Sequence, residues 1–555
     1  MKNFNIILAL LAMISLGSCS LDESPYSLTA EQLGTSESGA EQLVTGIYAT
    51  FWDNWCMEQT YMAWMDQDHD HCAAPGWVLS SAGAGNVTSH YAYNTNNDLW
   101  SVFYRMINRA NKAKETFEAS EAYLTDSSMS QLYGEVLFLR AFAYFHLVRM
   151  YGEVPLRLSS ESEQNMARSS VKKVYDQITS DLETAIQYLY YPSDGNVGAW
   201  GHVDKTAAQL LLARVYATMG SSALSQSKVD IFVDIKGEDT KFQCEPVAGA
   251  EDINPTECYT RVKQLCDEII GRRGIDFDLV DEYLNIWGGN NRKNKEFVWG
   301  VNSASDVDYQ CSGLHYYCTP APYGGAGAWL YMAPNLYSQY DSTDDRIVYG
   351  VWHYYLNSYT TANWYSYPPQ SETYTQENMP DNLKAFVDGF NGDYQYSVPC
   401  FTKWYKYDIS NPSLFTAREA ATTEQDIPLL RFAEAYLLRA EALVELDQVN
   451  NAMNDIDLVR RRAKATTLYS GIVTDKVQAR SLVLKERALE LCQEFNRKFD
   501  LLRWGLYLKV MNTTQSIQCG NSQRSTVRTQ KNLLYAIPTS EIAANELIGG
   551  NNYGY

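Results

Sequence analysis

The sequence predicts a mainly α-helical protein in which stacked helical hairpins frame a large irregular region with few short strands. Apolar residues recur every three or four positions over Gln131–Leu156 and again over Asp426–Gln448, the spacing of buried helix faces. Between about Ser221 and Gln425 this periodicity mostly fails, and Gly, Pro, Asn, Ser and Tyr accumulate. A loop-rich region of this length predicts a functional segment held in place by the helices.

The two helical windows differ in their apolar patterns. In the first, Leu132, Val136 and Leu139 form one stripe, and Gly152 and Pro155 end the helix. The second is apolar on two faces and rich in alanine, which lets neighbouring helices approach closely, as in a stacked array. Similar patterns predict helices over Leu99–Glu118, Val171–Leu189, Lys205–Thr218, Asn450–Lys464 and Val477–Leu508.

The N-terminal residues have the pattern of a bacterial lipoprotein export signal. The apolar run Ile6–Leu16 is too short to span a bilayer. Leu16-Gly17-Ser18-Cys19 resembles a lipobox, so we expect removal of residues 1–18 and acylation of Cys19, for example with palmitate; several chains anchor a protein better than one. A plain signal peptide with a chance cysteine is the alternative. Asp22 and Glu23 resemble the surface-export signals of Bacteroidetes lipoproteins, which predicts an outer-membrane protein facing the cell exterior.

Charge and cysteine content exclude several classes of protein. The net charge of −21 and pI near 4.8 disfavour binding to nucleic acid or to anionic lipid headgroups. None of the 11 cysteines forms a CxxC motif, which weakens a zinc or thioredoxin-type interpretation. Outside the cytoplasm, Cys56 with Cys72 and Cys311 with Cys318 are plausible disulfides. Cys492 lies in a helical pattern and is expected to be buried.

Tyrosine and tryptophan dominate the irregular region. Trp299–Tyr367 contains 17 aromatic residues and no Phe, although Phe makes up 18 of the aromatic residues of the chain. Tyr and Trp bury a ring face and keep a polar edge, which suits the C–H faces and hydroxyl rims of sugars. Packing is the alternative, and we assign Trp299, Tyr337 and Tyr340 to it. The candidate ligand contacts lie at Gly or Pro breaks or in polar loops: Trp77, Tyr316, Tyr323, Trp329 and Trp352, with Asp68 and Asn97 as partners for hydroxyls.

No group of carboxylates has the arrangement of a glycosidase site. Such a site needs two carboxyl groups about 5–10 Å apart across a cleft. Glu434 and Glu441 lie about 10 Å apart along one helix and point the same way. Glu486, Glu490 and Glu494 form a row of like charges that needs cations, so we expect an ion-pair network and no catalytic residue.

The polar run Asp66–Cys72 alternates Asp and His. Such a run can bind a metal ion, but it lacks the EF-hand glycine and the HExxH spacing. We expect a solvated or ligand-contacting loop, with a metal site as the alternative, and no cofactor elsewhere.

Segments spread over nearly the whole chain resemble the SusD/RagB family of outer-membrane lipoproteins. The most specific is Pro428–Leu443 (PLLRFAEAYLLRAEAL). The closing Gly549–Tyr555 resembles the family's terminal segment but lacks its proline. The other matching segments, in order, are Tyr104–Asn111, Leu139–Leu156, Ala207–Tyr216, Pro334–Arg346, Ile456–Ala463, Lys485–Gly505 and Leu534–Ile542.

The resemblance implies a tetratricopeptide-like scaffold and a surface protein that captures glycans without cleaving them. It also implies a partner, a SusC-like TonB-dependent transporter that the protein covers as a lid. The expected organisation is a signal peptide (1–18), an N-terminal helical region (19–220), a ligand-binding insertion (221–425) and a C-terminal helical region (426–555). A peptide-capturing relative and a surface glycoside hydrolase are the alternatives. The family's ligand contacts follow no fixed motif, so none is carried over to a residue here.

Overall fold

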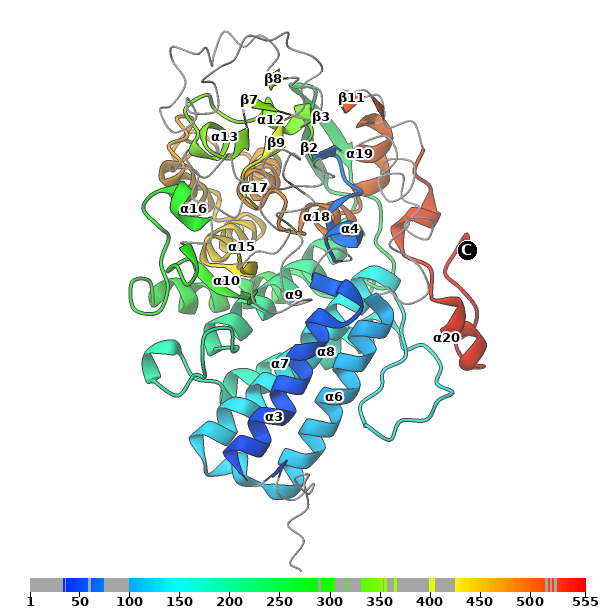
Figure 1. The fold of residues 1–555 in the computed structure, drawn as a ribbon. Coiled ribbons are helices and arrows are strands. Elements are labelled where there is room, and N and C mark those ends of the chain that lie inside the picture. The colour runs from blue at the N-terminus through cyan, green and yellow to red at the C-terminus, as the bar shows by residue number, and fades with distance from the viewer. Residues whose placement is uncertain are drawn as a thin grey trace, which may run out of the picture.

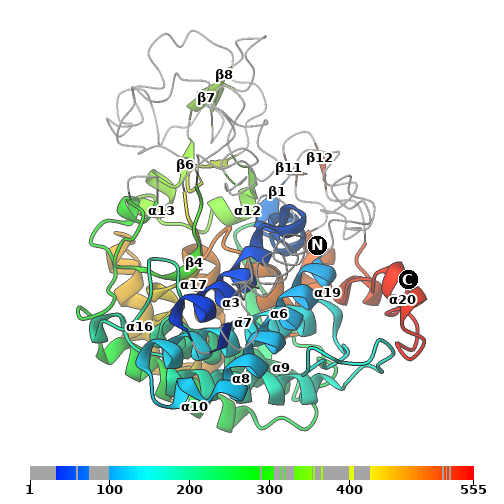
Figure 2. The ribbon, with the colours of Figure 1, turned by 60° about the horizontal axis from the view of Figure 1, so that its bottom comes forward.

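The computed structural model confirms a mainly helical protein with a few short strands (Figure 1). Two groups of helices lie side by side (Figure 1 and Figure 2). The structure describes residues 33–34, 36–57, 61–73, 99–287, 291–304, 314, 318, 331–352, 354–356, 364–366, 399–404, 425–514, 518–519, 522–523 and 527–555.

The N-terminal helices form the first group. Helix α3 (Glu37–Tyr48) packs against α6 (Leu99–Ser120) and α7 (Ser127–Tyr151), and α7 packs against α8 (Val171–Tyr188). Asp126 caps α7 by accepting a hydrogen bond from the Met129 amide, and Gly152 ends the helix at a φ of 73°. Helix α9 (Lys205–Ser225) follows, capped by Asp204, and joins this group to the second. The predicted N-terminal helices are confirmed, with α9 longer than expected.

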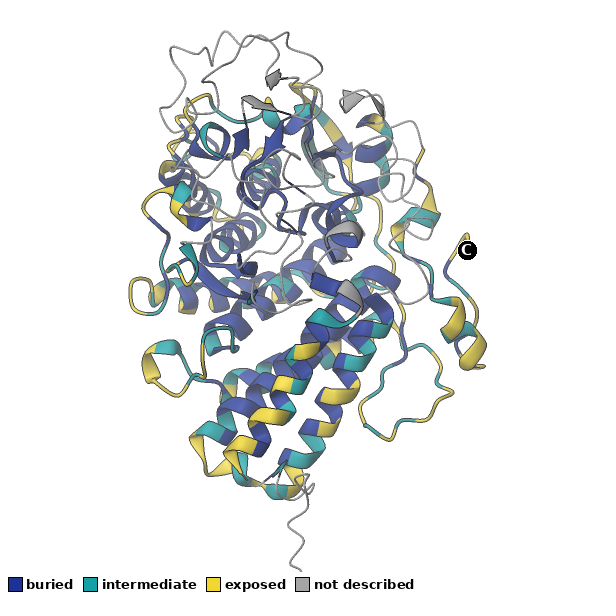
Figure 3. Cartoon of the chain, viewed as in Figure 1, coloured by how far each residue is buried: buried dark blue, intermediate teal, exposed yellow. Residues whose placement is uncertain are grey.

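Helix α7 lies at the centre of the first group and is buried almost along its whole length, as the dark-blue ribbon of Figure 3 shows. Phe138 and Phe142 meet the Trp299 ring edge to face, with ring centroids 4.8 and 5.3 Å apart. Trp299 is 1% exposed, so its assignment to the core is confirmed.

The second group contains α10 (Pro255–Gly271), α15 (Phe432–Glu445), α16 (Val449–Arg462) and α17 (Lys476–Glu490), each packed against the next. Helix α10 lies inside the region expected to be irregular, so the first part of that region belongs to the helical scaffold. The single helix predicted over Val477–Leu508 is also wrong, because the chain turns after Glu490 with left-handed Gln493 and Phe495. Two short helices follow the turn, α18 (Arg497–Arg503) and α19 (Tyr507–Thr514).

The strands of the described chain are short and antiparallel. Strands β2 (Asp230–Ile235) and β3 (Glu238–Gln243) form a hairpin, and β4 (Phe297–Val301) pairs with β10 (Ile427–Arg431). The remaining strands form a four-stranded sheet in the order β1 (Cys72–Ala73), β5 (Tyr331–Met332), β9 (Cys400–Phe401), β6 (Val351–Trp352), and the pairs β7 (Tyr354–Leu356) with β8 (Trp364–Ser366) and β11 (Gln518–Cys519) with β12 (Ser522–Gln523).

Short helical turns complete the described chain. None of its helices has the length and apolar character needed to cross a bilayer. The short α-helices are α4 (Tyr61–Asp66), α12 (Pro334–Tyr337), α13 (Asp345–Val348) and α20 (Thr539–Ala544), and the 3₁₀ turns are η1 (Ala49–Trp55), η5 (Ala122–Leu124), η6 (Pro192–Asp194), η7 (Tyr283–Ile286) and η11 (Gln530–Leu533).

A buried ion-pair network joins α15, α16 and α17 to the loops around them. Arg431 pairs with Glu490 (3.1 Å) and Glu494 (2.6 Å), and Arg346 pairs with Glu486 (2.5 Å) and Glu490 (3.2 Å). Burial alone would raise the pKa of Glu490, but the surrounding arginines outweigh it and hold that pKa well below its usual value. The predicted ion-pair network between packed helices is therefore confirmed.

Candidate functional site

Most of the predicted ligand contacts lie outside the described residues. These are Trp77, Asn97, Tyr316, Tyr323 and Trp329, and their roles stay predictions. Cys19, the predicted acylation site, lies outside the described residues as well.

Trp352 is described, and its predicted exposure is wrong. It lies in β6, which pairs with β9, and is 1% exposed. Its indole nitrogen donates a hydrogen bond to the Phe401 carbonyl oxygen at 3.0 Å. Trp352 is therefore a core side chain of the four-stranded sheet. Gly350, two residues earlier, had suggested an exposed turn.

Asp68 lies in the core, so its predicted contact with a ligand is wrong, and the loop Asp66–Cys72 is buried rather than solvated. Of the loop residues, His71 lines the second pocket described below. The loop residues are buried, and Asp68 is 2% exposed. Its carboxylate accepts hydrogen bonds from Arg528 (2.8 Å), Lys498 (3.3 Å) and the Tyr507 hydroxyl. Burial would raise the pKa of Asp68, but Lys498 and Arg528 lower it below the usual value.

The same loop is fixed by a second ion pair, between Asp70 and Arg497 (2.7 Å). Among the described residues, no group of three or more His, Cys, Asp or Glu side chains could hold a metal ion. The partners of Asp68 and Asp70 lie more than 400 positions away along the chain, and no local spacing reveals them.

The structure corrects one prediction about the cysteines. Cys56 is buried and forms no disulfide, so the predicted Cys56–Cys72 pair is wrong. Burial raises the pKa of the Cys56 thiol far above its usual value, which keeps it protonated and unreactive. Cys492 is buried as expected. Cys311 lies outside the described residues, so its pairing with Cys318 stays a prediction.

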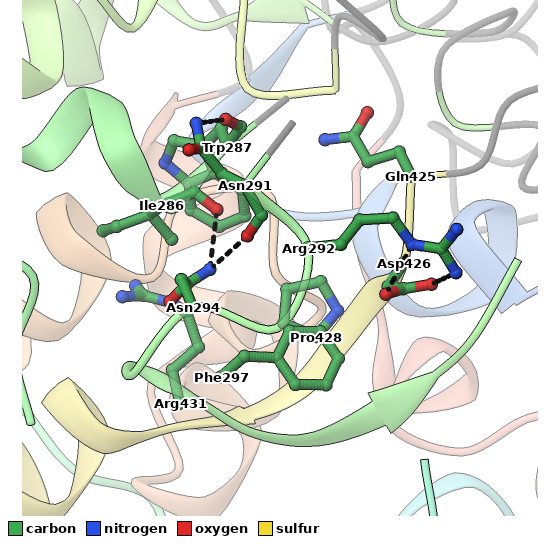
Figure 4. A pocket seen from close by; sticks show the side chains of 10 residues that line it. All are labelled: Ile286, Trp287, Asn291, Arg292, Asn294, Phe297, Gln425, Asp426, Pro428 and Arg431. Atoms are coloured by element: carbon green, nitrogen blue, oxygen red, sulfur yellow. Dashed lines mark hydrogen bonds and ion pairs between the residues drawn. The ribbon is translucent and has the colours of Figure 1, made fainter. Parts of the chain in front are cut away.

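Two pockets lie beside the strands. The first is small and partly open to solvent, and it lies between the segment Ile286–Phe297 and the start of β10 (Figure 4). Arg292 and Asp426 form a two-bond ion pair across it, at 3.0 and 2.7 Å. The Trp200 indole donates a third hydrogen bond to Asp426, at 3.1 Å. The other side chains that line this pocket are Ile286, Trp287, Asn291, Asn294, Phe297, Gln425, Pro428 and Arg431.

The Trp287 side chain at this first pocket has an unused donor. Its indole N–H is buried and has no hydrogen-bond partner in the described structure. An unsatisfied buried polar group costs about 1–3 kcal/mol, which a water or ligand hydroxyl can recover. The pocket therefore combines a fixed guanidinium–carboxylate pair with an indole whose N–H is unpaired.

The second pocket lies between the β2–β3 hairpin and α17. It is partly open to solvent, and Asp234, Asp239 and Lys485 line it. Sequence reasoning missed both pockets. A β-hairpin is indicated by the alternating stretch DIFVDI followed by Lys236-Gly237. This pattern predicts the β2–β3 wall of the second pocket, but it does not predict that the hairpin packs against α17.

The architecture belongs to a known class, that of the SusD-like structures. A SusD homolog from Bacteroides thetaiotaomicron matches with a TM-score of 0.71 and 19% identity, over 96% of this chain and 100% of that one. A laminarin binding SusD-like protein matches with a TM-score of 0.61 and 20% identity, over 94% and 100% of the two chains.

Sequence comparison identifies the family. A family model described as "Starch-binding associating with outer membrane" matches residues 20–217, and a model described as "SusD family" matches residues 295–555. SusD-like protein P25 of Formosa agariphila is 24% identical over 543 residues, 92% of each chain. The chain belongs to the SusD/RagB family.

Proposed function

We propose that this protein captures oligosaccharides or polysaccharides at the cell surface and passes them, uncleaved, to a partner SusC-like TonB-dependent transporter. The observation that carries the proposal is family membership over both parts of the chain, one of them matched by a model described as starch-binding and associated with the outer membrane. Acylated Cys19 would anchor the protein there.

The described pockets support a glycan as the ligand. Sugars offer a C–H face to aromatic rings and hydroxyls to polar groups, and the first pocket provides Trp287, Phe297 and the Arg292–Asp426 pair. Along the chain, Tyr316, Tyr323 and Trp329 fall between β4 and β5.

The helical carboxylates support a role without catalysis. Glu434 pairs with Arg214 and Arg487, and Glu441 pairs with Arg503. A general acid needs a raised pKa, whereas Arg214 and Arg487 outweigh burial and hold the pKa of Glu434 below its usual value. These acids are structural partners of arginines.

The test is affinity electrophoresis of the purified protein through gels that contain starch, laminarin, xylan or mannan. We expect retardation by at least one polysaccharide and no new reducing ends after incubation. Retention of peptides alone would favour the peptide-capturing alternative, and released reducing ends would favour a hydrolase. No retention by any glycan would contradict the proposal.

The aromatic contacts are tested by replacing Tyr316, Tyr323 and Trp329 with alanine. We expect retardation to weaken, because stacking on a sugar face is lost. Tyr553→Ala is the matched control, since Tyr553 is 75% exposed and lies in the C-terminal segment. Unchanged retardation of the triple variant would remove these residues from the site.

A further inference from the structure

The second pocket contains a pair of like charges. Asp234 and Asp239 stand directly opposite each other in the β2–β3 hairpin, where side chains of paired residues share one face of the strands. Two carboxylates in this arrangement repel and weaken the hairpin. Both line the pocket, so their charge is directed at its contents.

These carboxylates have few partners in the protein. The Asp234 carboxylate accepts a hydrogen bond from the Gly237 amide at 2.9 Å, and Lys485 approaches it to 3.7 Å. Within the described chain, no side chain or amide donates to the Asp239 carboxylate. Hydrogen-bond acceptors are thus available where a ligand can reach them.

The rest of the lining is fixed and partly apolar. Arg497 is held by Asp70 through two hydrogen bonds of 2.7 and 2.9 Å, so its charge is already balanced. The Ser481 hydroxyl accepts the Phe232 amide at 2.8 Å and donates to the Val477 carbonyl at 2.7 Å. Phe232 and Leu482 supply apolar surface. These walls are therefore fixed by contacts within the protein. The Asp234 and Asp239 carboxylates and the Lys485 ammonium remain for a ligand.

This combination fits a neutral sugar. Two carboxylates accept hydrogen bonds from hydroxyls, the Lys485 ammonium donates one, and the apolar side chains cover a C–H face. Since Asp70 balances Arg497, the remaining charges are those of Asp234, Asp239 and Lys485, with an excess of one negative charge. An acidic or sulfated sugar would be repelled.

The pocket also adjoins the sheet that flanks the aromatic-rich segment. The Ala333 amide, just after β5, donates to the His71 carbonyl at 2.9 Å, and His71 lines the pocket. Asn335 of α12 donates to the Asp234 carbonyl at 3.2 Å, which ties the hairpin to the same edge. Figure 1 shows β2 and β3 beside α12.

We infer that the pocket between the β2–β3 hairpin and α17 is a second glycan subsite, which binds one neutral sugar unit through Asp234, Asp239 and Lys485. The inference rests on the proposed function. It adds a subsite that lies on the hairpin and not on the aromatic segments, and it adds a preference for uncharged sugar units.

The experiment measures Kd by calorimetry for the neutral oligosaccharide cut from whichever polysaccharide retards the wild type most. Asp239→Asn and Lys485→Met are the test variants. Asp230→Asn is the matched control, since Asp230 lies in β2 of the same hairpin, pairs with Lys241 at 2.8 Å and does not line the pocket. We expect Kd to rise about tenfold in each test variant, typical for loss of a charged hydrogen bond, and to stay unchanged in the control.

Thermal unfolding separates binding from folding. Asp239→Asn removes a repulsion, so its Tm should equal or exceed that of the wild type while its affinity falls. If the wild type binds and both test variants bind equally well, the subsite is wrong and the proposed function stands. If a uronic-acid or sulfated oligosaccharide gains no affinity from Asp239→Asn, the charge preference is wrong. If the wild type binds no glycan, both the function and the subsite fail.

Discussion

The helical scaffold and the hairpin pocket use acidic side chains in opposite ways. Between α15, α16 and α17, Glu490 lies among Arg431, Arg346 and Arg462, and all four side chains are buried. In the β2–β3 pocket, Asp234 and Asp239 face each other, with Lys485 3.7 Å from the first. Acids that stabilise the fold are neutralised by arginines, whereas acids available to a ligand are left under-partnered at the surface.

The strongest way to break this comparison is Arg431→Met. The change leaves Glu296, Glu490 and Glu494 with one cation fewer in the interior, and breaking a buried pair costs about 3–5 kcal/mol. We expect a loss of that size in the free energy of unfolding, measured with urea. Lys295→Met is the control, because its pair with Asp281 is exposed and contributes at most about 1 kcal/mol. Equal losses in the two variants would refute a structural role for the network.

Glu490→Gln should have a smaller effect of the same sign. The amide keeps the shape of the side chain but removes the charge that faces Arg431 and Arg462, which costs about 1.5–3 kcal/mol. The measurement is the urea midpoint together with glycan retention at a temperature where the variant is folded. Retention should be unchanged. A variant with wild-type stability and altered binding would move Glu490 from the scaffold to the site.

Acid should weaken the scaffold through Asp500. Burial would raise the pKa of Asp500, but Arg487 (3.1 Å) and Arg503 (2.8 Å) outweigh it and lower this pKa to about 2. A depressed carboxyl pKa stabilises the fold above the unfolded value of about 3.9, and this contribution is lost as the pH falls toward 2. Denaturation between pH 7 and 2.5 should show a loss on the order of 2 kcal/mol. Asp500→Asn should flatten that part of the profile, and an unaltered profile would contradict the assignment.

The hairpin should give the smallest change in stability, with the opposite sign. Asp239→Asn relieves a cross-strand repulsion of at most about 1 kcal/mol, so we expect a Tm equal to or slightly above that of the wild type. Asp230→Asn breaks a partly exposed pair with Lys241 and should lower stability by less than about 1 kcal/mol. Destabilisation by Asp239→Asn would show that this carboxylate belongs to the scaffold, and the contrast between the two regions would disappear.

The sequence predicted the scaffold better than the site. Apolar periodicity located α7 and α15, and Glu486 and Glu490 required buried cations, because both patterns repeat within a few turns of one helix. Glu494 lies beyond the end of α17 and pairs with Arg431 there. The sequence placed Trp352 at the surface and Asp68 in a ligand-contacting loop, and both are core residues. Gly350, two residues before Trp352, does not show which strand will pair with the segment.

The sequence by itself determined the helical class, the assignment of Trp299 to the core and, through segments spread along the chain, the resemblance to the SusD/RagB family. Only the tertiary structure decided which charges meet: Asp68 with Lys498 and Arg528, and Asp234 with Asp239 beside Lys485. The physical reason is the range of the forces. Helix periodicity depends on neighbours three or four residues apart, whereas an ion pair depends on distances of a few ångströms between groups that can lie more than 400 positions apart in the chain.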